Sequence, residues 1–392
     1  MSKNKELIPE LRFPEFEDEG EWEYVNGNIL FEPISNKNHN SDLPILAITQ
    51  QQGAVPREEI NYNVSVTSES VNNYKVVEIE DFIISLRSFQ GGIEYSNYLG
   101  LCSPAYIILR KKEKITDHFF RHYFKSFTFI KDLNKNIEGI RDGKMISYKQ
   151  FSEILIPNPI VTEQQKIASC LTSLDELIDA HNKKLDLLKE HKKGLMQNLF
   201  PQEGEKVPIY RFPEFEGDGE WEDKKIHQIA KITTGNNDTQ NKVENGKFPF
   251  FVRSQNVERI DTYTLDCEAI LTSGDGVGVG KNFHYINGKF NFHQRVYCIY
   301  DFTNDVVGYY IYFYFSQHFN KRVMSMSAKN SVDSVRMSMI SEMSILFPKK
   351  TEQQKIASCL SSLDELITTQ EKKVEQLKQH KKGLMQGLFP TM

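Results

Sequence analysis

Apolar residues recur with alternating spacings of four and three residues along two long stretches of the chain, residues 162–199 and residues 351–388. This spacing keeps one stripe of a helix apolar and is typical of a coiled-coil seam. Eight of the ten seam positions in each stretch are apolar, and a polar layer falls near the middle, at His181 and at Gln370. The predicted apolar seam includes Ile167, Leu171, Leu174, Ile178, Leu185, Leu188, Ile356, Leu360, Leu363, Ile367, Val374 and Leu377.

The two stretches are copies of one another. TEQQKIASCL begins at Thr162 and again at Thr351, and thirty of the forty positions counted from these two starts are identical. A second repeat, RFPEFE followed by EWE, begins at Arg12 and at Arg211, so the chain is an internal duplication. Because one such helix alone would expose its seam, we expect the two copies to pack antiparallel within the chain. A zipper between two chains is the alternative.

The start of each predicted helix has its own signals. Thr162 is expected to be the N-cap, and Gln165, three residues later, would complete a capping box. A continuous helix over residues 162–199 would be about 57 Å long, at about 1.5 Å per residue.

Two segments of dissimilar sequence alternate with the repeated ones. Their short apolar runs, aromatic helical stretches and polar loops predict mixed α/β domains of one fold. The expected architecture is therefore two similar globular domains separated by a long antiparallel two-helix coiled coil. The predicted boundaries are 1–161 for the first domain with an acidic leader at 1–23, 162–201 for the central helix, 202–350 for the second domain with an acidic leader at 203–223, and 351–392 for the C-terminal helix.

Both domains follow one plan of an apolar strand, a polar glycine-containing loop, a further strand and an aromatic helix. In the second domain INGKF, from Ile286, has the Asn-Gly signature of a tight hairpin. The corresponding pairs are DFIISLRSFQGG from Asp81 and EAILTSGDGVGVGK from Glu268, strands at 105–109 and 296–300, and helices that begin near Asp117 and Asp305.

The glycine-rich stretch SGDGVGVGKN does not fit a nucleotide-binding loop. A Walker A motif requires Gly where Asp275 stands and Ser or Thr where Asn282 stands. We interpret the stretch as a loop that approaches another backbone closely. Since the sequence also lacks a Gly-x-Ser-x-Gly elbow and a His-Glu-x-x-His motif, it predicts a binding and spacing protein without catalytic or metal-ligating residues of its own.

Charge is distributed unevenly, although the net charge is only −5. The two leaders together carry −11, so the rest of the chain carries +6. Residues 110–149 hold eleven Lys and Arg against five Asp and Glu, and residues 281–337 hold seven against three. Such clustering is a footprint of phosphate binding, and an uneven solvated surface is the alternative.

Hydrophobic residues make up 39% of the chain, which is enough to bury cores. No apolar run reaches the roughly 18 residues that a membrane helix needs, and MSKNKELIPE has no apolar signal-peptide core. The five cysteines form no CxxC pair, so we expect a cytoplasmic protein with reduced thiols.

The two variable domains, the leader RFPEFE…EWE and the helical repeat that ends in HKKGLMQxLFP resemble the specificity subunit of type I restriction-modification enzymes. The resemblance implies that each variable domain is a target-recognition domain that binds one half of a bipartite double-stranded DNA sequence. It also implies that the coiled coil sets the gap and docks two methyltransferase subunits, and that restriction and translocase subunits can join. S-adenosylmethionine, ATP and Mg would then belong to these partners, and this chain would carry no cofactor.

Polar side chains in the predicted loops suit the reading of base edges, because Arg can bond to guanine and Asn or Gln to adenine in the major groove. Lysines are better suited to phosphates. Two other functions stay open, a coiled-coil scaffold whose heads bind protein and a stand-alone two-headed DNA-binding regulator. The DNA-contact candidates are Arg87, Ser88, Gln90, Asn136, Arg141, Lys144, Arg253, Gln255, Asn256, Gln294, Arg295, Lys329, Asn330 and Arg336.

Overall fold

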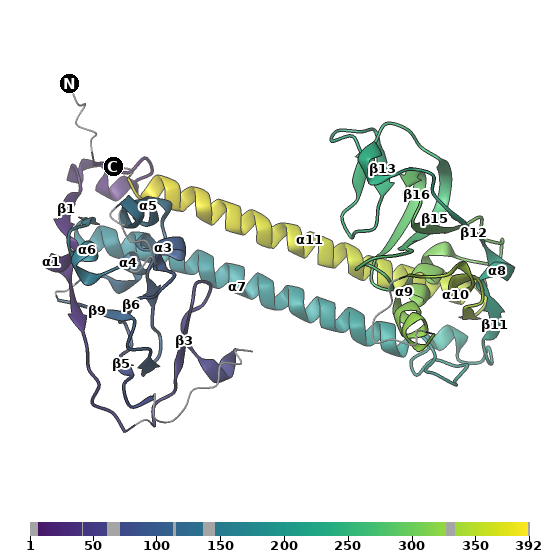
Figure 1. Ribbon diagram of the computed structural model, residues 1–392, viewed down its shortest axis with the longest axis horizontal. Coiled ribbons are helices and arrows are strands. Elements are labelled where there is room, and N and C mark those ends of the chain that lie inside the picture. Colours follow the sequence, from purple (N-terminus) through teal and green to yellow (C-terminus); the bar gives the residue numbers. More distant parts are fainter. Residues whose placement is uncertain are drawn as a thin grey trace. The chain divides into compact units, whose positions relative to one another are not determined.

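The computed structural model describes residues 7–40, 42–60, 71–112, 115–135, 146–326 and 334–390. The chain forms two compact units (Figure 1). Unit 1 comprises residues 1–182 and 372–392, and unit 2 comprises residues 183–371. Each unit therefore contains one variable domain together with a part of both long helices.

Unit 1 is a mixed α/β domain whose elements are all short. Its elements before the long helices are η1 (Pro14–Glu19), β1 (Glu23–Asn26), α1 (Gly27–Leu30), β2 (Phe31–Ile34), β3 (Leu46–Thr49), β4 (Gly53–Pro56), η2 (Arg57–Glu59), β5 (Lys75–Val77), β6 (Phe82–Ile84), α3 (Ser88–Gly91), β7 (Glu94–Tyr95), β8 (Gly100–Cys102), β9 (Ile107–Lys111), α4 (Asp117–Tyr123), α5 (Phe127–Lys135), α6 (Tyr148–Ser152) and β10 (Leu155–Asn158). Strands β2, β9, β6 and β7 form an antiparallel sheet in that order, while β1–β10, β3–β4 and β5–β8 pair separately.

Aromatic packing joins this sheet to its helices. The Phe31 ring lies 5.4 Å from that of Phe82 in β6 and 5.3 Å from that of Phe120 in α4. The aromatic helix expected from Asp117 is divided into α4 and α5, which end and begin on either side of Phe124. The division has a local cause, since the Ser126 hydroxyl accepts the Phe129 N–H at 3.2 Å and so favours a new helix start.

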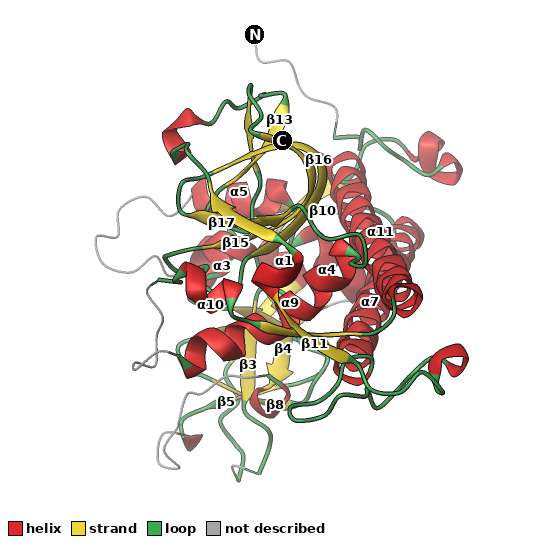
Figure 2. Cartoon of the chain, turned by 90° about the vertical axis from the view of Figure 1, so that its right-hand side faces the viewer, coloured by secondary structure: helices red, strands yellow, loops and turns green. Residues whose placement is uncertain are grey.

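Unit 2 has a larger sheet. Its elements are η3 (Pro213–Phe215), β11 (Glu222–Lys225), α8 (Ile226–Ile229), β12 (Lys231–Thr234), η4 (Thr239–Asn241), β13 (Phe248–Phe251), β14 (Glu258–Ile260), β15 (Leu265–Ser273), β16 (Phe283–Phe292), β17 (Val296–Tyr300), α9 (Gly308–Ser325), α10 (Met337–Ser341) and β18 (Ser344–Phe347). Six strands pair in the order β12-β17-β15-β16-β13-β14, and β11 pairs with β18. Helix α9 packs on this sheet (Figure 2). The Phe315 ring of α9 lies 5.6 Å from the Phe283 ring of β16.

The expected hairpin at INGKF is wrong. Asn287 and Gly288 lie inside β16 and pair with Glu268 and Cys267 of β15. The register explains why, because apolar side chains continue on both sides of the Asn-Gly step and β15 is long enough to pair through it. The turn between β15 and β16 is the glycine-rich stretch instead. It does approach another backbone closely, since a Cβ on Gly274 would lie 2.8 Å from the Arg295 carbonyl oxygen.

The long helices are α7 (Val161–Asn198) and α11 (Lys350–Leu388), and the part of each that belongs to a unit packs within that unit. Every predicted seam residue is buried or half-buried. In unit 2, Lys189 pairs with Glu371 and Lys192 with Asp364, so the two helices run antiparallel there. No helix in the described ranges combines the length and apolar character needed to cross a bilayer.

The expected N-cap at Thr162 is also wrong, because α7 begins at Val161 and Thr162 lies within its first turn. The helix start is held by Gln164 instead. Its side-chain amide donates to the Pro159 carbonyl at 2.8 Å and to Asn158 at 3.0 Å, and its oxygen accepts the Thr116 N–H at 3.0 Å. Gln164 therefore anchors the helix start to neighbouring segments, which differs from an N-cap that accepts the first N–H groups of the helix.

The first acidic leader is fixed to both long helices of unit 1. The Arg12 guanidinium donates to the Glu163 carboxylate at 2.8 and 2.9 Å and also to the Gly20 carbonyl. The Glu163 side chain is only 1% exposed and that of Arg12 only 6%. Leu11 N–H donates to the Gly387 carbonyl near the end of α11 at 2.8 Å.

The second leader repeats these contacts in unit 2. Arg211 donates to Glu352 at 2.8 Å through two nitrogens and to the Gly219 carbonyl. Tyr210 N–H donates to the Asn198 carbonyl at the end of α7 at 2.9 Å. In both units the leader thus binds the start of one helix copy and the end of the other. We call this set of repeated contacts the frame.

Candidate nucleic-acid interface

A groove of about 480 Å³ lies between the β3–β4 turn and the loop that follows β6 in unit 1. One wall is the run Gln50, Gln51 and Gln52. The other includes Leu86 and Arg87, which are both exposed. Amide and guanidinium groups are the side chains that read base edges, so this groove has the chemistry expected of a DNA-contact surface.

The Arg87 loop has a fixed backbone. The Ser88 hydroxyl accepts the Ser85 N–H at 2.9 Å, and the Arg87 N–H donates to the Ser85 hydroxyl at 3.3 Å. Gln50 donates to the Arg87 carbonyl at 3.4 Å and so joins the two walls of the groove. Behind the loop, Gly92 has a φ of +78°, and a Cβ there would lie 1.9 Å from the Phe124 carbonyl oxygen.

These contacts show which of the predicted DNA-contact residues of unit 1 are exposed and which hold the loop. Arg87 and Gln90 are exposed, and the Arg87 guanidinium makes no ion pair with any described residue. Ser88 is 1% exposed and holds the loop, which argues against a direct base contact by its hydroxyl. Asn136, Arg141 and Lys144 lie outside the described residues.

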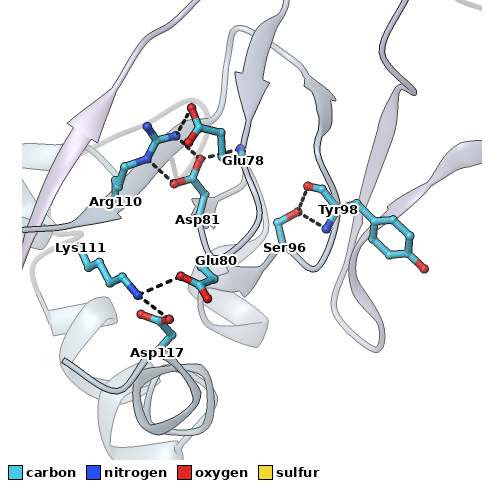
Figure 3. Close-up of polar contacts among 8 residues, drawn as sticks. All are labelled: Glu78, Glu80, Asp81, Ser96, Tyr98, Arg110, Lys111 and Asp117. Carbon is cyan, nitrogen blue, oxygen red and sulfur yellow. Dashed lines mark hydrogen bonds and ion pairs between the residues drawn. The ribbon is translucent and has the colours of Figure 1, made fainter. Parts of the chain in front are cut away.

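Part of the positive charge predicted for residues 110–149 is neutralised locally. Arg110 donates to both oxygens of Asp81 at 2.8 Å and lies 3.1 Å from Glu78 (Figure 3). Lys111 contacts Glu80 at 2.9 Å and Asp117 at 2.7 Å. This network fixes the turn before β6, whose other end carries the Arg87 loop, so these two cations hold the scaffold rather than phosphates.

The acids of this network differ in their titration. The hydrogen bond from Lys111 lowers the pKa of Glu80. Burial raises the pKa of Asp117, and Lys111 opposes that effect. The hydrogen bonds to Asp81 raise the pKa of Arg110 further above its ordinary value, so its charge persists at any physiological pH.

Three separate loops of unit 2 meet at one carboxylate. Asp275 accepts from Arg253 Nη1 at 2.9 Å through Oδ1 and from Arg295 Nη1 at 3.0 Å through Oδ2. The carboxylate is 17% exposed, whereas Arg253 is 45% and Arg295 63% exposed. The arrangement presents two guanidinium groups outward from a shared, more deeply placed acid.

The remaining candidates of unit 2 surround this cluster or lie apart from it. Gln294 is exposed and donates to Asp238 at 3.1 Å. Gln255 and Asn256 are exposed on the loop that follows Arg253. Arg336 is exposed, two residues after Ser334, which pairs with Asp275 in an isolated bridge. Lys329 and Asn330 lie outside the described residues.

Sequence reasoning missed two contributors to these surfaces. Gln50, Gln51 and Gln52 precede a glycine between two short apolar runs, and that turn composition is the signal that could have identified them. Asp275 entered the sequence argument only as the residue that breaks a Walker motif. Its two partners are 22 and 20 residues away, so no local pattern identifies it.

Comparison with known proteins accounts for both halves of the chain. The family described as "Type I restriction modification DNA specificity domain" matches residues 19–190 and 218–379. The chain is 25% identical to the specificity subunit of the type I restriction enzyme MjaVIII of Methanocaldococcus jannaschii, over 97% of this chain and 93% of that one. It is also 25% identical to the EcoDI specificity subunit of Escherichia coli over 43% of this chain and 37% of that one.

The fold has solved counterparts as well. The crystal structure of the S subunit of a type I restriction-modification system from M. genitalium aligns with a TM-score of 0.65 at 14% identity, over 98% of this chain and all of that one. A chain from a structural study of the assembly of the type I restriction-modification system aligns with a TM-score of 0.51 at 14% identity, over 94% of this chain and 97% of that one. The duplicated mixed α/β architecture expected from the sequence is confirmed, and the chain belongs to the family of type I restriction-modification DNA specificity domains.

Proposed function

We propose that this chain is the DNA sequence-recognition subunit of a type I restriction-modification complex, and that each unit reads one half of a bipartite target. The observation that carries the proposal is the presence of a different guanidinium- and amide-bearing surface in each unit, built on a frame whose contacts are the same in both. A repeated frame with unlike reading surfaces suits a target of two unlike half-sites.

In this proposal the chemistry belongs to partner subunits. Two methyltransferase subunits would carry S-adenosylmethionine, and restriction and translocase subunits would carry ATP and Mg. The glycine-rich loop supports this division, because a Cβ on Gly278 would lie 2.0 Å from the Asn282 amide nitrogen. Asn282 thus occupies the inside of the loop, which is where a nucleotide-binding loop would hold phosphate.

The outer faces of the long helices support docking of two copies of one partner. Leu177 of α7 and Leu366 of α11 are the same position in the two copies, and they are 44% and 56% exposed. One exposed leucine at the same position of each copy offers like subunits two equivalent places of contact.

A map of methylated adenines tests the proposal. The chain is expressed with its methyltransferase subunit in a host that lacks adenine modification, and the subunit alone serves as control. We expect a split motif that appears only when this chain is present. A soluble complex of both proteins that methylates no motif would reject the proposal in favour of a scaffold that binds protein.

The gap between half-sites is proposed to follow from the length of the two helices. Seven residues inserted after Lys183 and seven after Lys372, the same position of the repeat, would keep the 4-3 phase in both helices. They add about 10.5 Å at about 1.5 Å per residue, or about three base-pair steps. The methylation map should then show the same half-sites with a gap longer by about three base pairs, and an unchanged gap at full activity would contradict a helix-set spacing.

A further inference from the structure

We propose that Asp275 is a positioning residue for DNA reading by unit 2: it holds Arg253 and Arg295 side by side and, by its charge, keeps them from binding phosphate indiscriminately. The inference rests on the proposed function and deepens it. It concerns a residue whose own carboxylate touches no base.

The geometry gives Asp275 and the two arginines different roles, since Asp275 holds Arg253 and Arg295 while the arginines would face a ligand. Each oxygen of Asp275 accepts from one guanidinium, and each arginine uses only its Nη1 for the bond. A guanidinium has five N–H donors in a planar fork, so both arginines keep donors for a ligand. Both arginines are more exposed than the carboxylate, so we expect the donors that bond to no described residue to lie on the solvent side of the cluster.

The position of Asp275 is fixed by backbone hydrogen bonds on one side and by backbone conformation on the other. Gly274 N–H donates to the Arg295 carbonyl at 2.8 Å, and Val335 N–H donates to the Gly274 carbonyl at 2.7 Å. On the other side Gly276 has a φ of +80°, which an L side chain rarely adopts. The loop therefore places one carboxylate between two cations that come from distant segments.

Stability alone does not account for this arrangement. Ion pairs with partly exposed side chains add little to the free energy of unfolding. Restricting two long side chains, in contrast, lowers the entropy they would lose when each bonds bidentately to a guanine edge. The shared carboxylate also reduces the formal charge of the cluster from +2 to +1, and this charge governs binding to any phosphate backbone.

The two roles predict opposite effects on specific and non-specific binding. Asp275→Asn keeps the size of the side chain but removes its charge and loosens one guanidinium. Binding of the complex to a 40-base-pair duplex without the methylated motif should tighten at least threefold. The slope of log affinity against log salt should become steeper by up to about 0.9, the amount that one newly bound phosphate contributes.

The test uses the full chain with its methyltransferase subunit and two readouts, this salt titration and the methylation map. In the map, Asp275→Asn should relax the second half-site at one or more positions and leave the first unchanged, and Asp275→Glu should restore most of the discrimination. Asp301→Asn is the matched control, because it removes an exposed acid of the same unit that pairs with Lys231 at 2.8 Å. It should leave both readouts within twofold of the parent.

The outcomes distinguish this inference from the proposed function. A parent complex that methylates no motif removes the proposed function and the inference together. A parent that methylates a split motif, with Asp275→Asn unchanged in half-site and salt slope, overturns the role of Asp275 alone. Equal weakening of specific and non-specific binding would likewise overturn it, since a merely structural role predicts that result.

Discussion

The two units are attached to the long helices by the same residues, but their candidate DNA-contact surfaces consist of different residues. Arg12–Glu163 in unit 1 and Arg211–Glu352 in unit 2 fix the leader to a helix start through hydrogen bonds of 2.8–2.9 Å. Gln353 repeats the contacts of Gln164, accepting the Val307 N–H at 3.0 Å and donating to the Pro348 carbonyl at 2.9 Å. Both units are therefore attached to the long helices through the same side-chain contacts.

The reading surfaces have no such correspondence. Unit 1 carries its candidates beside a four-stranded sheet, on a loop closed by Ser88 and faced by three glutamines. Unit 2 carries them beside a six-stranded sheet, on loops drawn together by Asp275. The comparison shows that the same frame contacts can carry candidate DNA-contact surfaces made of quite different side chains.

The largest effect is expected from breaking the frame. Glu163→Ala leaves the buried Arg12 charge without its partner and should lower the free energy of unfolding of unit 1 by about 3–5 kcal/mol. Glu352→Ala should do the same to unit 2. The two tryptophans report the units separately, because Trp22 is buried in unit 1 and Trp221 in unit 2.

Denaturant unfolding followed by tryptophan emission checks this, with Trp221→Phe as background for unit 1 and Trp22→Phe for unit 2. Glu15→Ala is the control, because it removes an exposed partner of Lys166 and should change little. Equal stability of the parent and both buried-pair variants would refute the role given to the frame.

A smaller effect should sharpen the difference between the reading surfaces. Arg87→Ala should reduce discrimination at one half-site by about 10- to 100-fold, as loss of one bidentate base contact does, and leave the other half-site intact. Arg253→Ala should do the reverse, so each variant is the control for the other in a methylation map. Methylation unchanged in pattern and level by Arg87→Ala would exclude that residue as a reader.

The smallest effect concerns a position at which the aromatic helices of the two units differ. His122 lies six residues after Thr116, and Phe313 lies six residues after Val307. Burial, with the nearby charges of Lys381 and Arg121, lowers the pKa of His122 to about 3. Below pH 6.5 the unfolded chain therefore binds a proton at His122 that the folded chain does not bind. The free energy of unfolding present above pH 6.5 is lost progressively as the pH falls toward 3.

The loss should be about 1.4 kcal/mol per pH unit below pH 6.5 in unit 1. Asp175 lies 3.8 Å from His122, but it also pairs with Lys381, which limits its help to a protonated ring. Denaturant unfolding followed by Trp22 emission between pH 7.5 and 5 measures how the free energy of unfolding depends on pH. His122→Phe should reduce this pH dependence by up to the contribution of one bound proton. In unit 2, burial lowers the pKa of three other histidines, His284, His293 and His318. The pH profile of unit 2 should therefore not respond to His122→Phe, and an unaltered slope in unit 1 would show that other groups control it.

Periodic features could be predicted from the sequence, whereas contacts between side chains of distant segments could not. The seam from Ile167 onward is visible because a helix repeats its face at fixed spacing, and strand β17 has the bounds expected of it. The Asn287-Gly288 prediction failed because a turn signal is local, whereas pairing is decided by residues of β15 that lie 19 and 21 positions earlier in the chain. The Gln50 wall and the Asp275 cluster depend on loops that only the folded sheet brings together.

The reciprocal binding of each leader, to the start of one helix copy and the end of the other, has a consequence for inheritance. Leu11 contacts Gly387 and Tyr210 contacts Asn198, so both variable domains carry a leader that binds repeated residues of the long helices. A genetic crossover within the repeated segments would therefore deliver an unrelated sheet to contacts already in place. Because the frame is the same for both domains, a lineage would exchange its DNA targets while the long helices and their leader contacts stay unchanged.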